Sequence, residues 1–539
     1  MFTEVHRGEG AANRTASYLR PNVKIEPLIH RWHAWISLIS PATRAMNIAH
    51  RYMPNLKSFV SNPSVHVAAT KDPALLGGPF LALGHNDVAS AKALLDSTNS
   101  RCHKLLRFAE EYKKLDRRLQ ETATGAGLDP YYQSLPDELA GLVELTYDLN
   151  NHPSIKIIEE LLYEADADPG HEICLHMTSD EDREFFMSTP MLDRHGRVFL
   201  DLKFDDPRLD ELSMARFSPV CVEELAGMLE VRDVDLESFR ELFTPDPPSR
   251  ISPEYKGEEV RLRYFGHACV LLQTAEVSVL IDPFLAWRRD DGHATLTFAD
   301  LPDRIDYVVV THAHHDHFML EALLQLRDRI GQIVVPRNAR GRLADPSMEL
   351  ALNALGYRNC ITVEPFKSLV LPGGEIMSLP FSGEHCSLDI ASKHCVSIRL
   401  GGRHFAFFVD TDGVDPVLYQ RLAGRLGRID ALFMGMECHG APLSWLYGPL
   451  LSRPLTRRDD DSRRLSGSDC QRGLATVRNL DCSNVFVYAM GQESWLKYVM
   501  GLAYESDSVQ LQESSSFIEE CRKDGLTADR LFGCREIFF

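Results

Sequence analysis

The feature that most constrains this chain is a cluster of metal-binding side chains directly behind an apolar stretch. The apolar residues 307–310 are followed by HAHHDH at positions 312–317, which packs four histidines and one aspartate into six positions. In an extended loop, side chains two positions apart point the same way, so His312 and His314 can hold one cation together. Asp316 and His317 come where the chain turns into a helical pattern, and they can face a second cation. Imidazole and carboxylate ligands suit divalent first-row metals. The cluster therefore predicts a two-metal site at the end of a strand.

The stretches around this cluster predict a layered arrangement of sheets. Residues 259–274 and 276–284 have the composition of a β-hairpin, and residues 318–331 have the spacing of an amphipathic helix. Further strand patterns follow down to the stretch HFAFFVD at 404–410 and the strand that ends near position 437. Strands come first as a meander and then alternate with helices. We expect an α/β fold in the C-terminal half, with two stacked sheets and helices outside them in an αβ/βα sandwich.

The first half of the chain has a different pattern. Helical spacing occurs at 103–123, 135–151 and 151–168, and a strand-like piece occurs at 197–204. A stretch rich in proline and polar residues, 244–257, then has the composition of a linker. We therefore expect a mixed, helix-rich α+β domain over residues 1–247 and a catalytic domain over residues 258–539. The first domain shows no nucleotide loop in its sequence, and we expect it to serve dimerisation or substrate docking.

Composition excludes several classes of partner. The formal net charge of −19 argues against a nucleic-acid backbone as the main partner. The sequence has no apolar run of about 18 residues, so we expect no membrane span, and its first residues lack the plan of a secretory signal. The twelve cysteines are scattered without a CxxC pair. We expect them to be reduced thiols and the protein to be cytoplasmic.

The HxHxDH segment resembles the signature of the metallo-β-lactamase superfamily. The stretches GHACVLL and VLIDPF resemble the opening hairpin of that fold, where Asp282 would orient metal ligands rather than bind metal. Asp410, in FFVDTDG, matches the aspartate that bridges two metals in the superfamily. The resemblance covers about residues 258–539. It implies the fold more firmly than the chemistry, because the superfamily contains both hydrolases and oxygen-using enzymes.

Two ligand positions stay open on the residues alone. Glu384 and His385 are neighbours, and neighbours in an extended chain point to opposite faces, so one of them is expected to bind the first metal. Further on, either Glu437 or His439 can complete the second metal. If the glutamates are chosen, the site has three histidines and four carboxylates. Hard oxygen donors of this kind favour iron, whereas zinc with an activated water would favour a hydrolase.

A narrower resemblance favours iron. The segments GEHCSLDI, VDTDG, GMECHGAPLSWLYGPL and VYAMGQESWL are similar to those of the diiron β-hydroxylases of chloramphenicol biosynthesis. The resemblance implies a diiron monooxygenase that uses O2 and an electron donor. Its substrate would be an amino acid held as a thioester on a peptidyl carrier domain of a nonribosomal peptide synthetase. It also implies a homodimer formed through the N-terminal domain.

The same resemblance assigns the ligands. His312, His314 and Glu384 would bind one iron, and Asp316, His317 and Glu437 would bind the other. Asp410 would bridge the two irons, and Glu384 and Glu437 would be the carboxylates that shift during catalysis. The alternative is a dinuclear zinc hydrolase of an ester, lactone or phosphodiester, with His385 as a ligand.

Several other side chains are expected near this site. His315 is expected beside the ligands, and Gln492 or Glu493 either near the cavity or at a helix start. Trp445, Tyr447 and Trp495 are candidates for a substrate channel. The arginine-rich stretch 450–473 is a candidate docking surface for the carrier domain, since carrier domains are acidic, although a solvated loop with internal ion pairs is the alternative.

Overall fold

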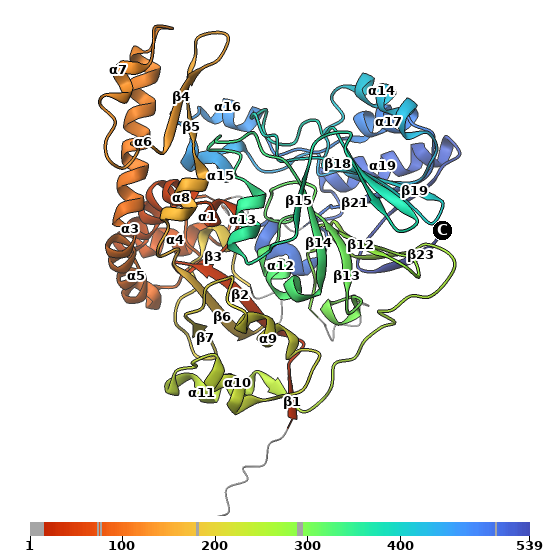
Figure 1. Ribbon diagram of the computed structural model, residues 1–539, viewed down its shortest axis with the longest axis horizontal. Helices are drawn as coiled ribbons and strands as arrows, with labels where there is room; N and C mark the ends of the chain where they lie inside the picture. Colours follow the sequence, from red (N-terminus) through yellow and green to blue (C-terminus); the bar gives the residue numbers. More distant parts are fainter. Residues whose placement is uncertain (1–15, 73–74, 76–77, 179–182, 288–294, 502–503) are drawn as a thin grey trace, which may run out of the picture.

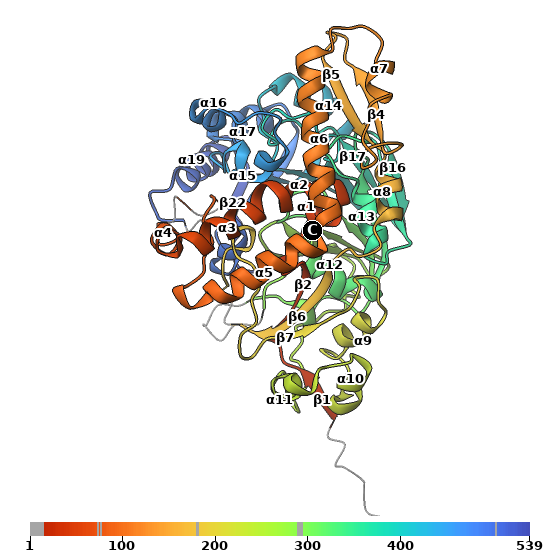
Figure 2. The same cartoon turned by 90° about the vertical axis from the view of Figure 1, so that its left-hand side faces the viewer.

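A computed structural model describes residues 16–72, 75, 78–178, 183–287, 295–501 and 504–539. The first part of the chain lies at the left and bottom of Figure 1, and the remainder forms the layered part at the right. Helix α6 (His103–Thr122) and the hairpin of β4 (Val143–Tyr147) and β5 (Pro153–Ile157) rise at one end of the molecule in both views (Figures 1 and 2). Within the described ranges, no helix is long and apolar enough to cross a membrane.

The layered part contains two sheets, each of seven strands among the described residues. In the first sheet, β10 to β12 form an antiparallel meander that β23 extends, and β12 to β15 run parallel. The strands in spatial order are β15 (Cys360–Val363), β14 (Ile330–Pro336), β13 (Ile305–Val309), β12 (Ser278–Ile281), β11 (Cys269–Gln273), β10 (Arg261–Gly266) and β23 (Arg535–Phe538).

The second sheet follows the same plan. It is antiparallel from β16 to β19 and parallel from β19 to β22. The strands in spatial order are β16 (Ser368–Leu371), β17 (Gly374–Leu379), β18 (Cys395–Leu400), β19 (Arg403–Val409), β20 (Ile429–Gly435), β21 (Cys482–Tyr488) and β22 (Thr527–Arg530). In parallel strands both faces are covered, which is why stretches such as FAFFV and ALFMG are almost continuously apolar.

The two sheets pack face to face around an apolar core, to which Leu272 and Ile281 contribute from the first sheet and Phe407 and Phe433 from the second. Helices α12 (Leu320–Leu326) and α13 (Met348–Ala354) pack against the first sheet, and α14 (Pro416–Leu426), α17 (Cys470–Arg478) and α19 (Val509–Lys523) pack against the second. The expected αβ/βα sandwich is confirmed.

The N-terminal part is mixed, as expected. A four-stranded antiparallel sheet contains β3 (Trp32–His33), β2 (Val23–Ile29), β6 (His171–Met177) and β7 (Val198–Leu200). The main helices beside it are α2 (Pro41–Asn47), α3 (Met53–Ser61), α5 (Val88–Arg101) and α6. The helix predicted at 103–123 is confirmed. The helix predicted over 135–151 was wrong, because β4 lies there, and the third helical pattern contains β5 before α8 (Glu159–Ala165).

Helix α12, directly after the histidine cluster, is buried on every side. All seven of its residues are buried, because the N-terminal part covers the face that would otherwise be solvated. Its two polar side chains are paired across this contact: Glu321 lies 3.2 Å from the Lys24 ammonium, and Gln325 accepts a hydrogen bond of 3.1 Å from Arg216. The expected amphipathic helix is therefore shorter than predicted and has no solvated face. The arrangement fixes the base of the histidine loop from both parts of the chain.

Candidate metal centre

The histidine cluster forms the loop between β13 and α12. His312 and His317 are fully buried, and His314 is 8% exposed. His312 forms an isolated β-bridge with Lys393, and the Thr311 carbonyl accepts a hydrogen bond of 2.8 Å from the His394 amide. This pairing brings the loop between β17 and β18, which carries Glu384, next to the histidines.

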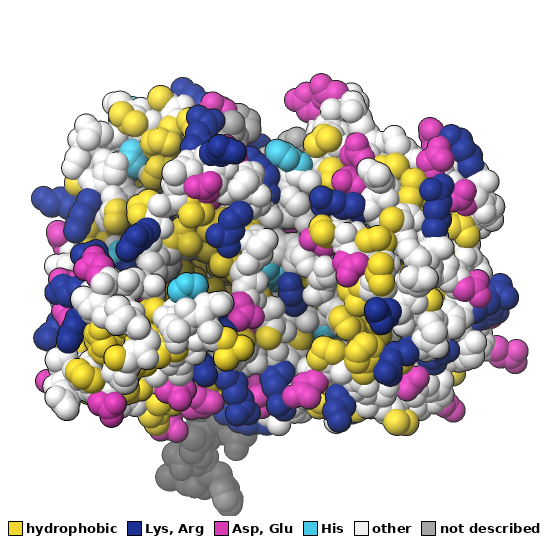
Figure 3. Space-filling model, turned by 90° about the horizontal axis from the view of Figure 1, so that it is seen from above, with side chains coloured by type: hydrophobic (Ala, Val, Ile, Leu, Met, Phe, Trp, Pro, Cys, Tyr) yellow, Lys and Arg dark blue, Asp and Glu magenta, His cyan; other side chains and the backbone are white. Residues whose placement is uncertain are grey.

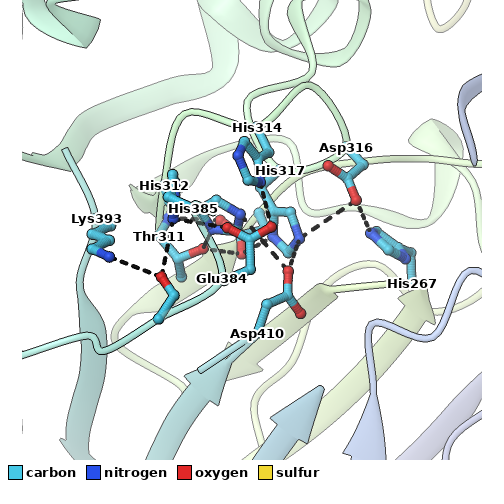
Figure 4. A network of polar contacts seen from close by, with 12 residues as sticks. His267, Thr311, His312, His314, Asp316, His317, Glu384, His385, Lys393 and Asp410 are labelled. Atoms are coloured by element: carbon cyan, nitrogen blue, oxygen red, sulfur yellow. Dashed lines mark hydrogen bonds and ion pairs between the residues drawn. The ribbon is translucent and has the colours of Figure 1, made fainter. Parts of the chain in front are cut away.

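Glu384 meets the first two histidines of the cluster (Figure 4). His312, His314 and Glu384 each offer a ligand atom within 4.8 Å of the others. The Glu384 carboxylate is 2.8 Å from Nδ1 of His314. Burial, the largest single influence, lowers the pKa of His314, but the charge and hydrogen bond of Glu384 together with the charge of Asp316 raise it overall. The three side chains form a compact pocket of two imidazoles and one carboxylate that can hold one divalent cation.

Asp410 lies on the other side of His312. It follows β19, and its Oδ2 is 3.0 Å from Nε2 of His317 and 3.7 Å from Nε2 of His312. These three residues form a second group of potential ligands that shares His312 with the first group. The carboxylate therefore stands between the histidines assigned to the two metals, which is the placement that a bridging ligand requires.

Asp316 points away from Glu384 and toward a histidine that the sequence reasoning missed. His267, in the turn between β10 and β11, has its Nε2 3.1 Å from Oδ2 of Asp316. His267, Asp316 and His317 together form a third group of potential ligands. The one signal in the sequence was the histidine of the GHACVLL stretch, whose resemblance to an opening hairpin was used only for the fold.

Asp282 fixes the orientation of the cluster from beneath. Its carboxylate is fully buried and accepts hydrogen bonds from the Thr311 amide at 2.8 Å and the Thr311 hydroxyl at 2.7 Å. It also lies 2.8 Å from Nδ1 of His317. A carboxylate at Nδ1 fixes the proton on that nitrogen and leaves Nε2 free to bind metal. This geometry supports the expectation that Asp282 orients ligands rather than binds metal.

Glu437 reaches the same cavity from the end of β20. The cavity has a volume of about 70 Å³, and its carboxylates and histidines are His314, His315, Asp316, Glu384, Asp410 and Glu437. One oxygen of Glu437 accepts a hydrogen bond of 3.1 Å from Gln510. Burial raises the pKa of Glu437 to about 8. Glu437 lies outside the three groups of potential ligands, as its ligand atoms are farther than 4.8 Å from at least one member of each. It nevertheless lines the cavity, whereas His439 is exposed and does not, so the geometry favours Glu437 over His439.

His385 is close to the site but differently placed from Glu384. Its ring stacks on His314 with 4.3 Å between centroids, and its Nδ1 is 2.8 Å from Oε2 of Glu384. Its other ring nitrogen is buried without a hydrogen-bond partner among the described residues. His385 belongs to none of the three groups of potential ligands found in the described chain, so the geometry favours Glu384 over His385.

The residues fit a pair of metal ions. Nε2 of His312, Oδ1 of Asp410 and Oε2 of Glu437 are buried and form no hydrogen bond with the described part of the chain. Such atoms are rarely left unpaired in a folded protein, and metal coordination would satisfy all of them. Four carboxylates around the cavity also match the preference of iron for hard oxygen donors.

The other expected side chains divide into two sets. Trp445 and His315 line the cavity, and the Tyr447 hydroxyl is 3.2 Å from Nε2 of His314. Trp495 instead packs edge-on against Phe284 in the core.

Glu493 stands at the N-terminal end of η9 (Ser494–Leu496), yet its side chain makes no cap hydrogen bond there. It accepts hydrogen bonds from the Tyr264 hydroxyl at 2.9 Å and the His267 amide at 3.3 Å, so it supports the turn that carries His267.

Comparisons with known proteins find similarity to diiron β-hydroxylases over almost the whole chain. Residues 18–247 match the diiron non-heme beta-hydroxylase N-terminal domain family, and residues 278–441 match the beta-lactamase superfamily domain. The chain is 34% identical to the 4-amino-L-phenylalanyl-[CmlP-peptidyl-carrier-protein] 3-hydroxylase of Streptomyces venezuelae over 95% of this chain and 98% of that protein. The crystal structure of CmlA, a diiron beta-hydroxylase from Streptomyces venezuelae, superposes with a TM-score of 0.90 at 32% identity and covers 98% of this chain and 100% of that one. A metal-dependent hydrolase of Opitutus terrae is 31% identical over 31% of this chain and 69% of its own length.

Proposed function

Because the chain belongs to the family of diiron non-heme β-hydroxylases, we propose that it hydroxylates the β-carbon of an amino acid carried by a peptidyl carrier domain. The reaction would consume O2 and two electrons from a separate donor protein. The amino acid would be held as a thioester on a nonribosomal peptide synthetase. The observation that carries the proposal is the convergence of four carboxylates on one small cavity beside the histidine cluster.

In the proposed ligand set, His312, His314 and Glu384 would hold one iron, Asp316, His317 and Glu437 would hold the other, and Asp410 would serve both. When bound, the two irons would supply the activation of O2 and the oxidation of the substrate C–H bond. Glu384 and Glu437 would be the carboxylates of this set that adjust during turnover. The hydrogen bond from Gln510 restrains Glu437 on one side only.

Apolar side chains line part of the same cavity. Leu446 and Leu465 are buried, and together with Trp445 and Met500 they line the same cavity. Apolar surface here excludes water from the reacting carbon and suits an amino-acid side chain with an aromatic or aliphatic body. We therefore assign the amino-acid end of the substrate to this apolar part of the cavity.

For the carrier domain, the candidate surface is the arginine-rich segment around α16 (Arg457–Ser462), which lies near the top of Figure 1. Arg453, Arg457 and Arg458 are exposed. The face seen from above in Figure 3 is hollowed, with hydrophobic side chains in the hollow and Lys or Arg side chains around it. Internal ion pairs take part of this charge, since Arg457 and Arg464 both approach Asp461.

This docking surface can be tested directly. Replacing Arg453 and Arg458 by alanine should weaken binding of the loaded carrier domain, and the loss should shrink as salt is added. Titration of a fluorescent carrier domain at two salt concentrations would measure the effect. Unchanged affinity in the double variant would remove this segment from the interface.

The proposal also includes the domain boundary, the oligomeric state and the cellular location expected from the sequence. We propose a domain boundary between residues 247 and 258, an N-terminal part that forms a homodimer contact, and a cytoplasmic location. All twelve cysteines lie within the described ranges and are free thiols there, which supports a reducing compartment.

One observation favours a second candidate, a dinuclear zinc hydrolase of an ester, lactone or phosphodiester. Nε2 of His385 has no hydrogen-bond partner among the described residues, and its ring stacks on His314, so His385 is the neighbouring side chain that could be a ligand in place of Glu384. A neutral third histidine would suit zinc and an activated water.

Metal analysis of protein made in iron-supplemented cells separates the two candidates. We expect two irons per chain and a visible spectrum that bleaches with dithionite and returns with oxygen. Glu384→Ala should abolish iron binding or turnover, while His385→Ala should retain the metal. Two tightly held zinc ions without a redox response, or the opposite ranking of the two variants, would favour the hydrolase.

A further inference from the structure

The loop that carries Glu384 has an unfavourable backbone. Between β17 and β18 the chain adopts positive φ at Gly383 (84°), Glu384 (62°), Cys386 (53°) and Ser387 (57°). Residues other than glycine rarely occupy this region, and a run of them persists only where the surroundings impose it. Contacts outside the loop must therefore hold Glu384 toward the histidines.

Asp345 provides the most concentrated of these contacts. Its side chain is fully buried in the segment between β14 and α13. One oxygen accepts hydrogen bonds from the Ala391 amide at 3.0 Å and the Ala339 amide at 2.6 Å. The other oxygen accepts from the Ser392 amide at 3.2 Å and from the Ser392 hydroxyl. A single carboxylate thus ties the far end of the Glu384 loop to the neighbouring segment 337–347.

That segment is in turn held by the N-terminal part of the chain. The Gly341 carbonyl accepts a hydrogen bond of 2.7 Å from the Ile157 amide at the end of β5. Glu159, at the start of α8, accepts from the Ser347 amide at 3.2 Å. Contacts therefore run from β5 and α8 through segment 337–347 to the loop of a metal ligand. Neither Asp345 nor its partners Ala391 and Ser392 belong to the ligand groups found among the described residues.

We propose that Asp345 is a positioning residue that presents Glu384 to the first metal. It acts through the backbone of residues 391 and 392 and touches neither metal nor substrate. The inference rests on the proposed assignment of Glu384 as a ligand, but it concerns metal binding in general and holds for iron or zinc alike.

Asp345→Asn tests the proposal with little change of shape. Both oxygens accept from backbone amides, so an amide nitrogen at either position would face an N–H group and break part of the clamp. We expect the metal on the Glu384 side to be bound about tenfold more weakly than in the wild type. The site of Asp316, His317 and Glu437 should keep its metal. Metal titration against a chelator and the visible spectrum of the iron-loaded protein would report both effects.

Two further variants make the outcome decisive. Asp389→Asn makes the same chemical change at the exposed ion pair with Arg342, which is another tie between this loop and segment 337–347. Because a solvated ion pair contributes little, this variant should bind two metals with wild-type affinity. Ser392→Ala removes one donor to Asp345 and should weaken the same metal to a smaller extent, with a smaller loss of stability than Asp345→Asn. If Asp345→Asn does not fold, Ser392→Ala decides alone. Unchanged metal affinity in the folded variants, or equal loss of both metals, would overturn the proposal. A wild-type protein that holds two zinc ions and hydroxylates nothing would refute the hydroxylase instead, and would leave this test valid.

Discussion

At the scale of single residues, several positions around the candidate metal site have left-handed backbone. His267, Asp282, Glu384, Val409 and Ala489 all have positive φ between 42° and 62°. Each stands at or next to the end of a strand of the two sheets, or in the loop that carries a ligand. A β-branched residue such as Val409 is rarely found in this conformation, and here it directs the following Asp410 into the site. Backbone conformations that cost free energy therefore occur here where a side chain must point into the site.

Asp282 gives the first prediction at this scale. Asp282→Asn would place an amide group against His317 Nδ1 and the Thr311 donors, so the proton on His317 would no longer be fixed. We expect metal affinity to fall about 10–100-fold with the fold retained. Chelator competition would measure the loss, with circular dichroism to check the fold. The exposed Asp303→Asn serves as the matched control, and equal affinity in the two variants would contradict the role given to Asp282.

Glu159 gives a prediction about pH. Burial raises the pKa of this carboxyl to about 7. A folded-state pKa above the unfolded value means that its stability contribution is complete below about pH 4.5 and is lost as pH rises through about 7. Glu159→Gln has no carboxyl to deprotonate, so its free energy of unfolding should rise relative to the wild type by up to about 3 kcal/mol between pH 4.5 and a pH above 7. The amide also meets the donors Ser40 and Ser347, which adds a cost that is the same at both pH values. Denaturant unfolding at both pH values tests this, with the exposed neighbour in Glu160→Gln as the control. A constant difference at the two pH values would contradict it.

At the scale of elements, the candidate site lies where strands of both sheets end. The histidine cluster follows β13, Asp410 follows β19, and Glu437 follows β20. Since parallel strands present their carboxyl ends at the same edge of a sheet, the strand-then-ligand order places Asp410 and Glu437 together at one edge of the second sheet. The histidine cluster belongs to the first sheet, and only the resemblance to the metallo-β-lactamase superfamily implied that the two edges meet. The residues alone left the choice between Glu384 and His385 open, and only the family resemblance implied Glu384. The orientation of Glu384 depends on left-handed backbone and on contacts from segment 337–347, which the sequence does not show.

The wrong helix has a comparable physical cause. Residues 143–147 and 153–157 bury every second side chain, as in Val143 and Leu145 or Ile155 and Ile157. Over five residues this alternation is too short to outweigh a nearby helix-start signal at Pro136 and Asp137. The antiparallel pairing of β4 with β5 makes these residues strands, and this pairing can be seen only in the structure.

Strand β20 gives the prediction at this scale. A Cβ at its last residue, Gly435, would lie 2.4 Å from Oδ1 of Asp410 and 2.8 Å from the Val409 carbonyl. Gly435→Ala must therefore displace the proposed bridging carboxylate, and we expect at least about tenfold weaker metal binding. Gly424→Ala in α14 meets no atom within 4 Å and should bind metal normally. Metal titration of both variants compares them directly, and equal affinities would show that Asp410 does not need this space.

At the scale of the whole molecule, the N-terminal part and the sandwich share one apolar core. A single cluster of buried side chains joins Trp32 and Phe186 from the first part to Phe284, Leu323 and Tyr498 from the second. Arg327 strengthens the contact, because its guanidinium donates to the carbonyls of Phe204 at 2.5 Å and Asp206 at 2.9 Å. Sequence composition suggested a linker and two domains, but it could not show how much apolar surface each part buries against the other.

This shared core predicts how the chain unfolds. If the two parts stabilise each other, calorimetry of the full chain should give one cooperative transition rather than two. Residues 248–539 expressed alone would expose the wholly buried helix α12, so they should bind a hydrophobic dye, aggregate and lose metal, because α12 anchors the histidine loop. Residues 1–247 provide the matched fragment, and mixing the two should restore part of the metal binding. Two separate transitions, or a stable metal-loaded fragment 248–539, would instead mean that the histidine loop is set by the sandwich alone and that the N-terminal part serves only docking or dimerisation.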